Sequence, residues 1–344
     1  NANGNLNLAS PIRLRLGIEG RQLDLRALWP QAPATSIDVD TDFGLHVEKG
    51  QVLVDLGGSL KPTTVGTFQV PAVDFSGNAV DTTFTGEAKL HDQGLPLDLG
   101  FSIYPDGKIE LDAEAKRVNL AEVERIKPYF DGSGTADMRV HAALDHGRLD
   151  TNLTLDVRGV TYQGVALKNA HLTAGAKGSL DKVDQLALDA RLTGKQLTAG
   201  RFAFADVSAT ARGPLRSPVV STTLKDPNGP SLDARATVAL GNPVSMRAIT
   251  VGVSRDNVEI RGDVARLDVS DDRVLVSDLK LYGASGELRG NAEITPGAFS
   301  VSAQGQNLDL SAFSRVLGLP RGLLEGRASV KVDAAAGNRT ERGT

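Results

Sequence analysis

Two histidines and an aspartate lie close together in the sequence and could in principle hold a metal ion. His141, Asp145 and His146 supply imidazole and carboxylate groups, which are common ligands of zinc. However, Asp145, His146 and Gly147 together have the composition of a hairpin turn, and neighbouring strand residues point to opposite faces of a sheet. We therefore interpret these residues as a solvated turn and predict no metal site.

Other catalytic patterns are missing from the sequence. The remaining histidines, His46, His91 and His171, are isolated, and neither a Gly-x-Ser-x-Gly motif nor a Walker A motif occurs. Residues 226–229, Asp-Pro-Asn-Gly, resemble the start of a calcium loop but lack the later ligands and the closing Glu, which favours a turn. The sequence predicts no enzyme and no cofactor.

The composition narrows the class of protein further. Of 344 residues, 40% are hydrophobic but only 4% are aromatic, so a core would consist of Leu, Val, Ala and Ile. The absence of Cys excludes disulfides and thiolate metal sites, but it does not identify the compartment. The 38 basic and 42 acidic residues are interspersed, which argues against a nucleic-acid partner. No apolar stretch approaches the roughly 18 residues that a helix needs to span a membrane.

The elements that must position any functional group are strands. Residues 95–103 alternate strictly between apolar and polar positions, which is the pattern of a strand with one apolar face. Pro105, Asp106 and Gly107 supply a turn, and residues 109–115 continue the alternation as the return strand. The same period recurs along the chain, so we predict an all-β fold.

A sheet with one apolar face must bury that face or use it. Too few aromatic residues are present for the girdles of a membrane barrel, and no repeat of 20 to 30 residues indicates a solenoid. The pattern favours an elongated, twisted and curved antiparallel sheet that forms a trough with an aliphatic interior. The residues that we predict to line this groove are Leu14, Leu16, Leu97, Leu99, Phe101, Leu153, Leu155, Leu186 and Leu188.

Two nearly identical peptides indicate an internal repeat. Residues 20–28 (GRQLDLRAL) and 305–313 (GQNLDLSAF) each join a predicted strand to a short helix, and a similar joint follows Val118. Their spacing predicts repeats of about 95 residues. We expect one continuous groove over residues 1–333, joints near 23–30, 118–128 and 308–318, a degenerate joint near 213, and a disordered tail over 334–344.

These joints, together with ARGPLRSPVVSTTLKD (211–226) and LVSDLKLYGASGELRGNAEI (275–294), give the chain a resemblance to a known family. Residues 1–334 resemble the TamB/AsmA-like family, a group similar to the bridge-like lipid transfer proteins. The resemblance implies a repeating β-groove that is hydrophobic inside, in a protein that an N-terminal helix anchors in the inner membrane of a diderm bacterium. The chain begins at Asn1 without Met, and we expect it to be a central fragment of such a protein.

The resemblance also implies a location and partners. The groove would lie in the periplasm and conduct phospholipids between the inner and outer membranes, with acyl chains inside and head groups at the open seam. The expected partners are phospholipid acyl chains and an outer-membrane barrel protein of the assembly machinery. The alternative is a scaffold or chaperone that captures outer-membrane proteins at an edge strand. The sequence does not separate these two functions.

Overall fold

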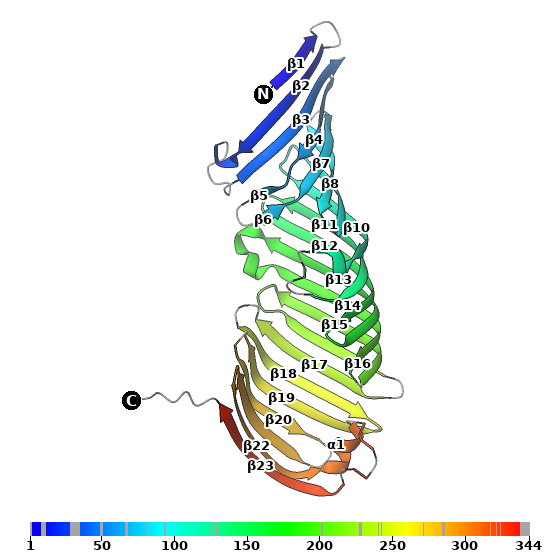
Figure 1. Ribbon diagram of the computed structural model, residues 1–344, viewed down its shortest axis with the longest axis vertical. Helices are drawn as coiled ribbons and strands as arrows, with labels where there is room; N and C mark the ends of the chain where they lie inside the picture. The colour runs from blue at the N-terminus through cyan, green and yellow to red at the C-terminus, as the bar shows by residue number, and fades with distance from the viewer. Residues whose placement is uncertain are drawn as a thin grey trace, which may run out of the picture. The chain divides into compact units, whose positions relative to one another are not determined.

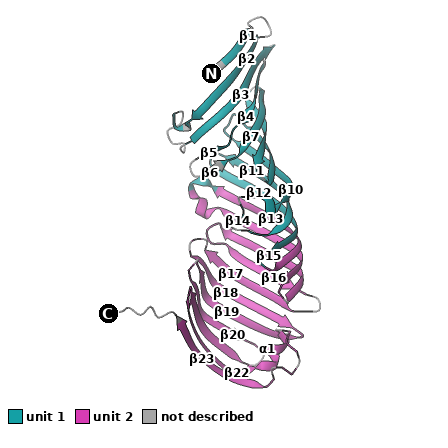
Figure 2. Ribbon diagram, in the orientation of Figure 1, with its two compact units in different colours: residues 1–163, 179–181 teal, residues 164–178, 182–344 magenta. Residues whose placement is uncertain are grey.

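The structure is a computed structural model in which nearly all regular elements are strands (Figure 1). It divides into two compact units, residues 1–163 with 179–181 and residues 164–178 with 182–344 (Figure 2). The residues that the structure describes are 2–7, 12–27, 35–48, 51–65, 68–80, 82–92, 94–124, 126–127, 130–200, 202–226, 229–239, 241, 243–270, 272–283, 286–316, 318–320, 322–323 and 325–337.

Unit 1 is one open antiparallel sheet. Its strands pair in the order in which they occur in the sequence, except that a short ribbon of β5 (Thr63–Val65) and β6 (Phe68–Val70) branches from β3. The main sheet comprises β1 (Ala2–Asn7), β2 (Ile12–Leu23), β3 (Thr35–Glu48), β4 (Gln51–Leu60), β7 (Ala72–Val80), β8 (Thr83–Asp92), β9 (Leu95–Ile103), β10 (Ile109–Asn119), β11 (Ser133–Asp145) and β12 (Arg148–Tyr162).

Unit 2 repeats this construction, again with each strand antiparallel to the next in the sequence. Its strands are β13 (Val165–Ser179), β14 (Ala187–Ala199), β15 (Phe202–Pro214), β16 (Val219–Lys225), β17 (Ser231–Ala239), β18 (Val244–Arg255), β19 (Val258–Val269), β20 (Val274–Tyr282), β21 (Glu287–Thr295), β22 (Ala298–Asp309) and β23 (Arg327–Gly337). The predicted fold class, an all-β chain with a curved antiparallel sheet, is confirmed.

Short helical segments follow three of the strands. They are η1 (Leu25–Ala27) after β2, η2 (Leu120–Glu122) after β10 and α1 (Leu310–Val316) after β22, and they coincide with three of the predicted joints. A further segment, η3 (Leu180–Gln185), precedes β14. None of the helical segments among the described residues has the length and apolar character that crossing a membrane requires.

A β-bulge precedes each of η1, η2 and α1. Gln22, Arg117 and Asn307 have positive φ angles of 52°, 51° and 53°, and the strand register shifts at each of them. The Gln22 amide donates to Asp38 Oδ1 at 2.8 Å, and the Arg117 amide donates to Asp137 Oδ1 at 2.7 Å. The peptides that resembled one another in the sequence thus share a bulge, which kinks the strand before it leaves the sheet.

Glycines show toward which face the sheet bends. On the apolar face, a Cβ at Gly77 would lie 2.8 Å from the Thr85 carbonyl oxygen, and one at Gly86 would lie 2.9 Å from that of Ser76. On the polar face, a Cβ at Gly57 would have no neighbour nearer than 3.9 Å, and one at Gly100 would meet nothing within 4 Å. Neighbouring backbones therefore converge on the apolar side, where only glycine fits the closest approaches. The apolar face is the inner face of the curve, as predicted.

Parts of the predicted boundaries need correction. Ala334–Gly337 were predicted to belong to a disordered tail, but they continue β23 and pair with residues 298–301 of β22. Backbone pairing does not require apolar alternation, so the Ala-rich sequence concealed this strand end. The joint near residue 213, predicted to be degenerate, needs no correction: β15 runs to Pro214 and a turn leads to β16 without a helix. Residues 28–30 of the first joint and 338–344 of the tail lie outside the described residues.

Candidate functional site

The strand registers arrange the apolar side chains of unit 1 in continuous rows. Leu16 of β2 faces Phe43 of β3, Phe43 faces Leu56 of β4, and the row continues across the sheet without a charged residue. We call the surface made by such rows the apolar face of unit 1. Its two central rows are Ile18, Thr41, Gly58, Phe75, Ala88, Leu99, Ala113, Val140 and Leu153, and Gly4, Leu16, Phe43, Leu56, Gly77, Gly86, Phe101, Leu111, Ala142 and Thr151.

Unit 2 has a corresponding apolar face. Ala190 of β14 faces Ala211 of β15, and Leu188 of β14 faces Gly213. The central row of this face crosses from β13 to β23 through Leu172, Leu192, Ala209, Thr222, Ala234, Val251, Gly262, Leu281, Leu288, Gly305 and Val330.

Most of these apolar side chains are not covered by a second layer. The chain exposes 22107 Å² of surface, whereas a compact monomer of its mass, 36.2 kDa, exposes about 13,400 Å². No large side chain among the described residues is less than 2% exposed, and Leu6 and Ile18 of the apolar face are 60% and 41% exposed. Soluble monomers rarely expose a continuous apolar surface of this extent unless it binds something.

The predicted groove residues fall into three environments. Leu14, Leu16, Leu99, Phe101 and Leu153 lie in the uncovered rows of unit 1, and Leu188 lies on the apolar face of unit 2. Leu97 and Leu155 are on the same face of unit 1 but pack against a small buried cluster. Leu186 precedes β14, is 4% exposed and packs on Gly178, so it is a buried residue at the margin of the sheet.

In unit 1 the buried cluster closes one end of the apolar face. It consists of Ala115, Val118, Val123 and Ala136, and Ile126 packs against it. Val118 comes directly after the Arg117 bulge, and Val123 follows η2. Asn119 caps η2, because its Oδ1 accepts from the Ala121 amide at 3.3 Å. The bulge therefore turns the chain onto the apolar face, and the segment after it covers Leu97 and Leu155.

In unit 2 the helix α1 takes this covering role. Ala312 is fully buried and Val316 is 4% exposed, and both pack with Val258 and Ile260 of β19. The carboxylate of Asp309 caps the helix and accepts from the amides of Ser311 and Ala312 at 2.9 and 3.2 Å. Hydrogen bonds from the Ser311 hydroxyl and these amides hold the pKa of Asp309 below its usual range. Sequence reasoning did not predict which groove residues these segments would cover.

Three histidines, His91, His141 and His146, are each paired with a carboxylate. His141 Nδ1 lies 2.8 Å from Asp112 Oδ1, and His91 Nε2 lies 2.7 Å from Asp74 Oδ2. His146 contacts its neighbour Asp145 in the turn, which is the environment that the sequence predicted. No group of three or more potential metal ligands occurs among the described residues.

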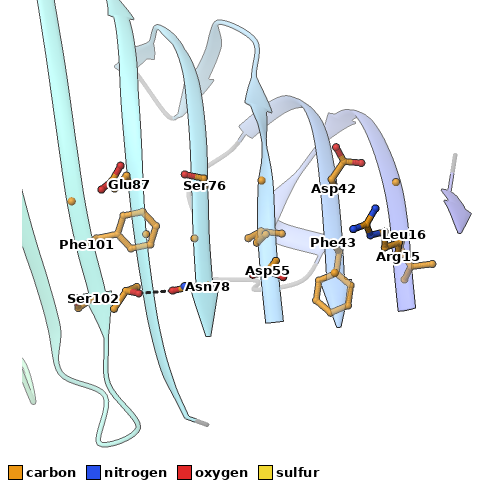
Figure 3. Close-up of a pocket in the computed structure, with 18 of the residues that line it drawn as sticks. Arg15, Leu16, Asp42, Phe43, Asp55, Ser76, Asn78, Glu87, Phe101 and Ser102 are labelled. Atoms are coloured by element: carbon orange, nitrogen blue, oxygen red, sulfur yellow. Dashed lines mark hydrogen bonds between the residues drawn. The ribbon is translucent and has the colours of Figure 1, made fainter. Parts of the chain in front are cut away.

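The polar face of unit 1 carries a recess of about 1320 Å³ that sequence reasoning missed (Figure 3). Its lining comes from two adjacent polar rows and from the apolar row between them, whose side chains alternate to the other face. Asp42, Asp55 and Glu87 come from β3, β4 and β8, and Arg15 lies at the β2 end of the lining (Figure 3). The only sequence signal was a run of small residues, such as Gly44 and Gly57, at polar positions of the strands.

One carboxylate of this recess is strongly engaged. The pKa of Glu110 is held below its usual range by hydrogen bonds from Lys108 and from Tyr104, whose hydroxyl lies 2.8 Å from Glu110 Oε2. Asp112, which also lines the recess, pairs with His141. Asp42, Asp55 and Glu87 form no ion pair with other residues in the described part of the chain.

Comparison with protein-family models, with curated proteins and with solved structures finds no match for this chain.

Proposed function

We propose that the chain is a segment of a lipid-conducting groove in which the apolar faces hold phospholipid acyl chains. The observation that carries this proposal is the continuity of the apolar rows: in unit 1, two neighbouring rows cross from β2 to β12 without a charged side chain. No second layer covers their central part among the described residues. A surface with these properties replaces the hydrocarbon environment of a lipid tail.

The energetics favour a surface of this kind. Each methylene kept from water is worth about 0.8 kcal/mol, so a chain of about 16 carbons loses about 13 kcal/mol on exposure to water. A uniform row of Leu, Phe, Ala and Gly shields the methylenes without a polar group that would hold the lipid at one position. An acyl chain can then move along the rows without crossing a large free-energy barrier between neighbouring positions. The charged polar face keeps the outside of the sheet in water.

The location belongs to the same proposal. A path of this kind is needed where lipids cross an aqueous space, and we propose the periplasm of a diderm bacterium, between the inner and outer membranes. The family resemblance of the sequence supports this location. The parent protein would be anchored in the inner membrane and would meet a barrel protein of the assembly machinery at the outer membrane.

Photo-crosslinking from one strand tests the proposal directly. A photoreactive amino acid at Leu99 or Phe101 faces the uncovered rows of β9, whereas one at Asp98 or Ser102 faces the opposite side of the same strand. After irradiation in cells, mass spectrometry should find phospholipid adducts at Leu99 and Phe101. The adducts should be at least about tenfold fewer at Asp98 and Ser102, because the polar face offers no apolar contact.

Two outcomes would contradict the proposal. Equal lipid labelling on both faces would mean that the label reports random collision with membranes. Polypeptide adducts at Leu99 in place of lipid would favour the alternative function, a scaffold for outer-membrane proteins. Leu97 provides an internal reference, because the cluster around Val123 covers it and its lipid labelling should be lower than that of Leu99.

A further inference from the structure

The two units carry opposite net charge. Unit 1 has 15 Lys and Arg against 24 Asp and Glu, a formal net charge of −9. Unit 2 has 23 Lys and Arg against 18 Asp and Glu, a formal net charge of +5. The near-neutral total of the chain conceals this division. Charge of one sign spread over a whole unit creates a field that attracts a partner of the opposite sign.

The strand registers place carboxylates opposite one another in unit 1. Asp98 of β9 faces Glu114 of β10, and Glu19 faces Asp40 in the same polar row, whose members are Glu19, Asp40, Ser59, Asp74, Lys89, Asp98, Glu114, Arg139 and Thr154. Like charges directly opposite on neighbouring strands destabilise a sheet. The recess beside this row adds Asp42, Asp55 and Glu87, which have no ion pair with described residues.

Unit 2 shows the reverse arrangement. Lys280 of β20 faces Arg289 of β21, and Arg247 of β18 faces Arg266 of β19. Lys280 and Arg289 belong to a row that we call the basic row: Thr173, Arg191, Thr210, Ser221, Arg235, Thr250, Asp263, Lys280, Arg289, Gln304 and Lys331. Five cations share this row with one carboxylate. Arg191, Arg235 and Lys280 are exposed, and none has an ion pair with another described residue.

We propose that two copies of this chain associate through their polar faces, with the acidic recess of unit 1 in one copy receiving the basic row of unit 2 in the other. Each face supplies the charges that the other lacks, and the residues without an ion pair among the described residues, Asp42, Asp55 and Glu87 in unit 1 and Arg191, Arg235 and Lys280 in unit 2, would gain partners. The apolar faces remain free, so this association does not depend on the proposed lipid function.

Spacing and area agree with such a contact. Asp42 on β3 and Glu87 on β8 are three strands apart, as are Arg191 on β14 and Arg235 on β17. Strands repeat every 4.8 Å or so, which places both pairs about 14 Å apart. A face of ten strands and three polar rows, with rows about 6.8 Å apart, covers about 1,000 Å², which exceeds the roughly 800 Å² per partner of a stable interface. The long Arg and Lys side chains can reach into the recess of unit 1.

Sedimentation velocity of the full chain at low and high salt tests the association. At 50 mM NaCl we expect self-association, and at 500 mM NaCl we expect monomers, because salt screens exposed charges. In one variant, Asp42→Lys, Asp55→Lys and Glu87→Lys make the recess of unit 1 basic. In a second, Arg191→Glu, Arg235→Glu and Lys280→Glu make the basic row of unit 2 acidic. Each variant alone should associate at least about tenfold more weakly.

Mixing the two variants gives the decisive measurement. In the first variant both the recess and the basic row are positive, and in the second both are negative, so the mixture should form a mixed complex although each variant alone associates weakly. This recovery would also show that both variants are folded. Lys182→Glu, an exposed change in η3 outside the basic row, should leave association unchanged. A wild-type chain that stays monomeric at 50 mM NaCl, or binds only anionic phospholipid vesicles, would overturn the proposal, as would variants that fail to combine.

Discussion

The two units share one backbone plan but differ in what covers the apolar face. In unit 1 the cover is a short segment after β10, in which η2 is a single 3-10 turn and Val123 is the main buried side chain. In unit 2 it is the helix α1, whose residue Ala312 is completely buried against β19. The bulge before each cover is equivalent, so the difference arises in the residues that follow it. The sheet is thus a constant framework, and its covers are the variable part.

The largest expected difference between the two units is the loss of stability caused by a charge placed in the cover of unit 2. Ala312→Asp would bury a carboxylate among Val258, Ile260 and Val316, which costs about 3 kcal/mol or releases α1 from the sheet. Ala121→Asp is the matched change in unit 1, and it should have little effect because Ala121 is exposed in η2. Amide hydrogen exchange in β18 and β19 measures the release of α1, and exchange in β11 gives the corresponding measurement for η2. If both variants lost the same amount of protection, the two covers would be equivalent.

The next largest effect is the loss of stability when a glycine of the apolar face gains a Cβ, and it tests whether the sheets of both units bend toward that face. A Cβ at Gly86 in unit 1 or at Gly290 in unit 2 would lie 2.9 or 2.8 Å from a carbonyl oxygen of the neighbouring strand. Gly86→Ala and Gly290→Ala should each lower the free energy of unfolding by about 1 to 3 kcal/mol. Urea denaturation gives this quantity.

The controls for this test lie on the polar face. A Cβ at Gly100 would meet no atom within 4 Å, and one at Gly252 would lie 3.8 Å from its nearest neighbour, Glu259 Oε1. Neither has a positive φ, so Gly→Ala at these positions should raise stability by about 0.4 to 1 kcal/mol through the unfolded state. Destabilisation by the polar-face changes would argue against the assigned direction of bending.

A smaller loss of stability is expected when a bulge amide loses its side-chain acceptor, and comparing this loss in the two units tests whether their bulges are equally important. In unit 1, Asp137 accepts from the Arg117 amide at 2.7 Å. Unit 2 has a similar bulge within β20, where Asp278 has a φ angle of 52° at a register shift, and Asn291 accepts from the Asp278 amide at 2.8 Å. Asp137→Ala and Asn291→Ala each leave a bulge amide without its partner, which costs about 1 kcal/mol. Thermal unfolding monitored by circular dichroism reports the loss. Asp137→Asn keeps an acceptor and should retain most of the stability.

The smallest effect is a difference in pH dependence between the two covers. The cap of α1 is Asp309, whose folded pKa is lowered, whereas the cap of η2 is Asn119, which does not titrate. A carboxylate with a lowered pKa contributes stability above its unfolded pKa, near 3.9, and that contribution is lost as the pH falls through the folded value. Exchange of the Ser311 and Ala312 amides should therefore accelerate below about pH 4, with no matching change at Ala121. Asp309→Asn should remove this pH dependence.

The sequence predicted the strands and the apolar face because both depend on local alternation. Leu97, Leu99 and Phe101 share a face by their spacing alone, and the structure places them there. The sequence did not reveal that Leu97 is covered, because its cover comes from Val118 and Val123, more than twenty residues later. Alternation assigns a residue to a face, but only tertiary contacts decide whether that face is open.

The polar face was harder to predict than the apolar face. Its rows depend on the register between strands, and one residue of slippage moves every side chain to the other face. The bulges at Gln22, Arg117 and Asn307 shift the register between neighbouring strands, so alternation along one strand does not determine which polar residues face one another across the sheet. The whole-chain charge of −4 suggested no electrostatic partner, because the acidic and basic sheets cancel in the total.

The order of the strands has a consequence for how the chain reaches its folded state. In each unit almost every strand pairs with the strand that precedes it in the sequence, so each pairing closes only a short loop of chain. Low contact order favours rapid folding, and a short loop costs little closure entropy. Such a sheet can grow hairpin by hairpin as the polypeptide emerges from a ribosome or a translocation pore. Its length can also change over evolution by the duplication or loss of single hairpins, without a new architecture.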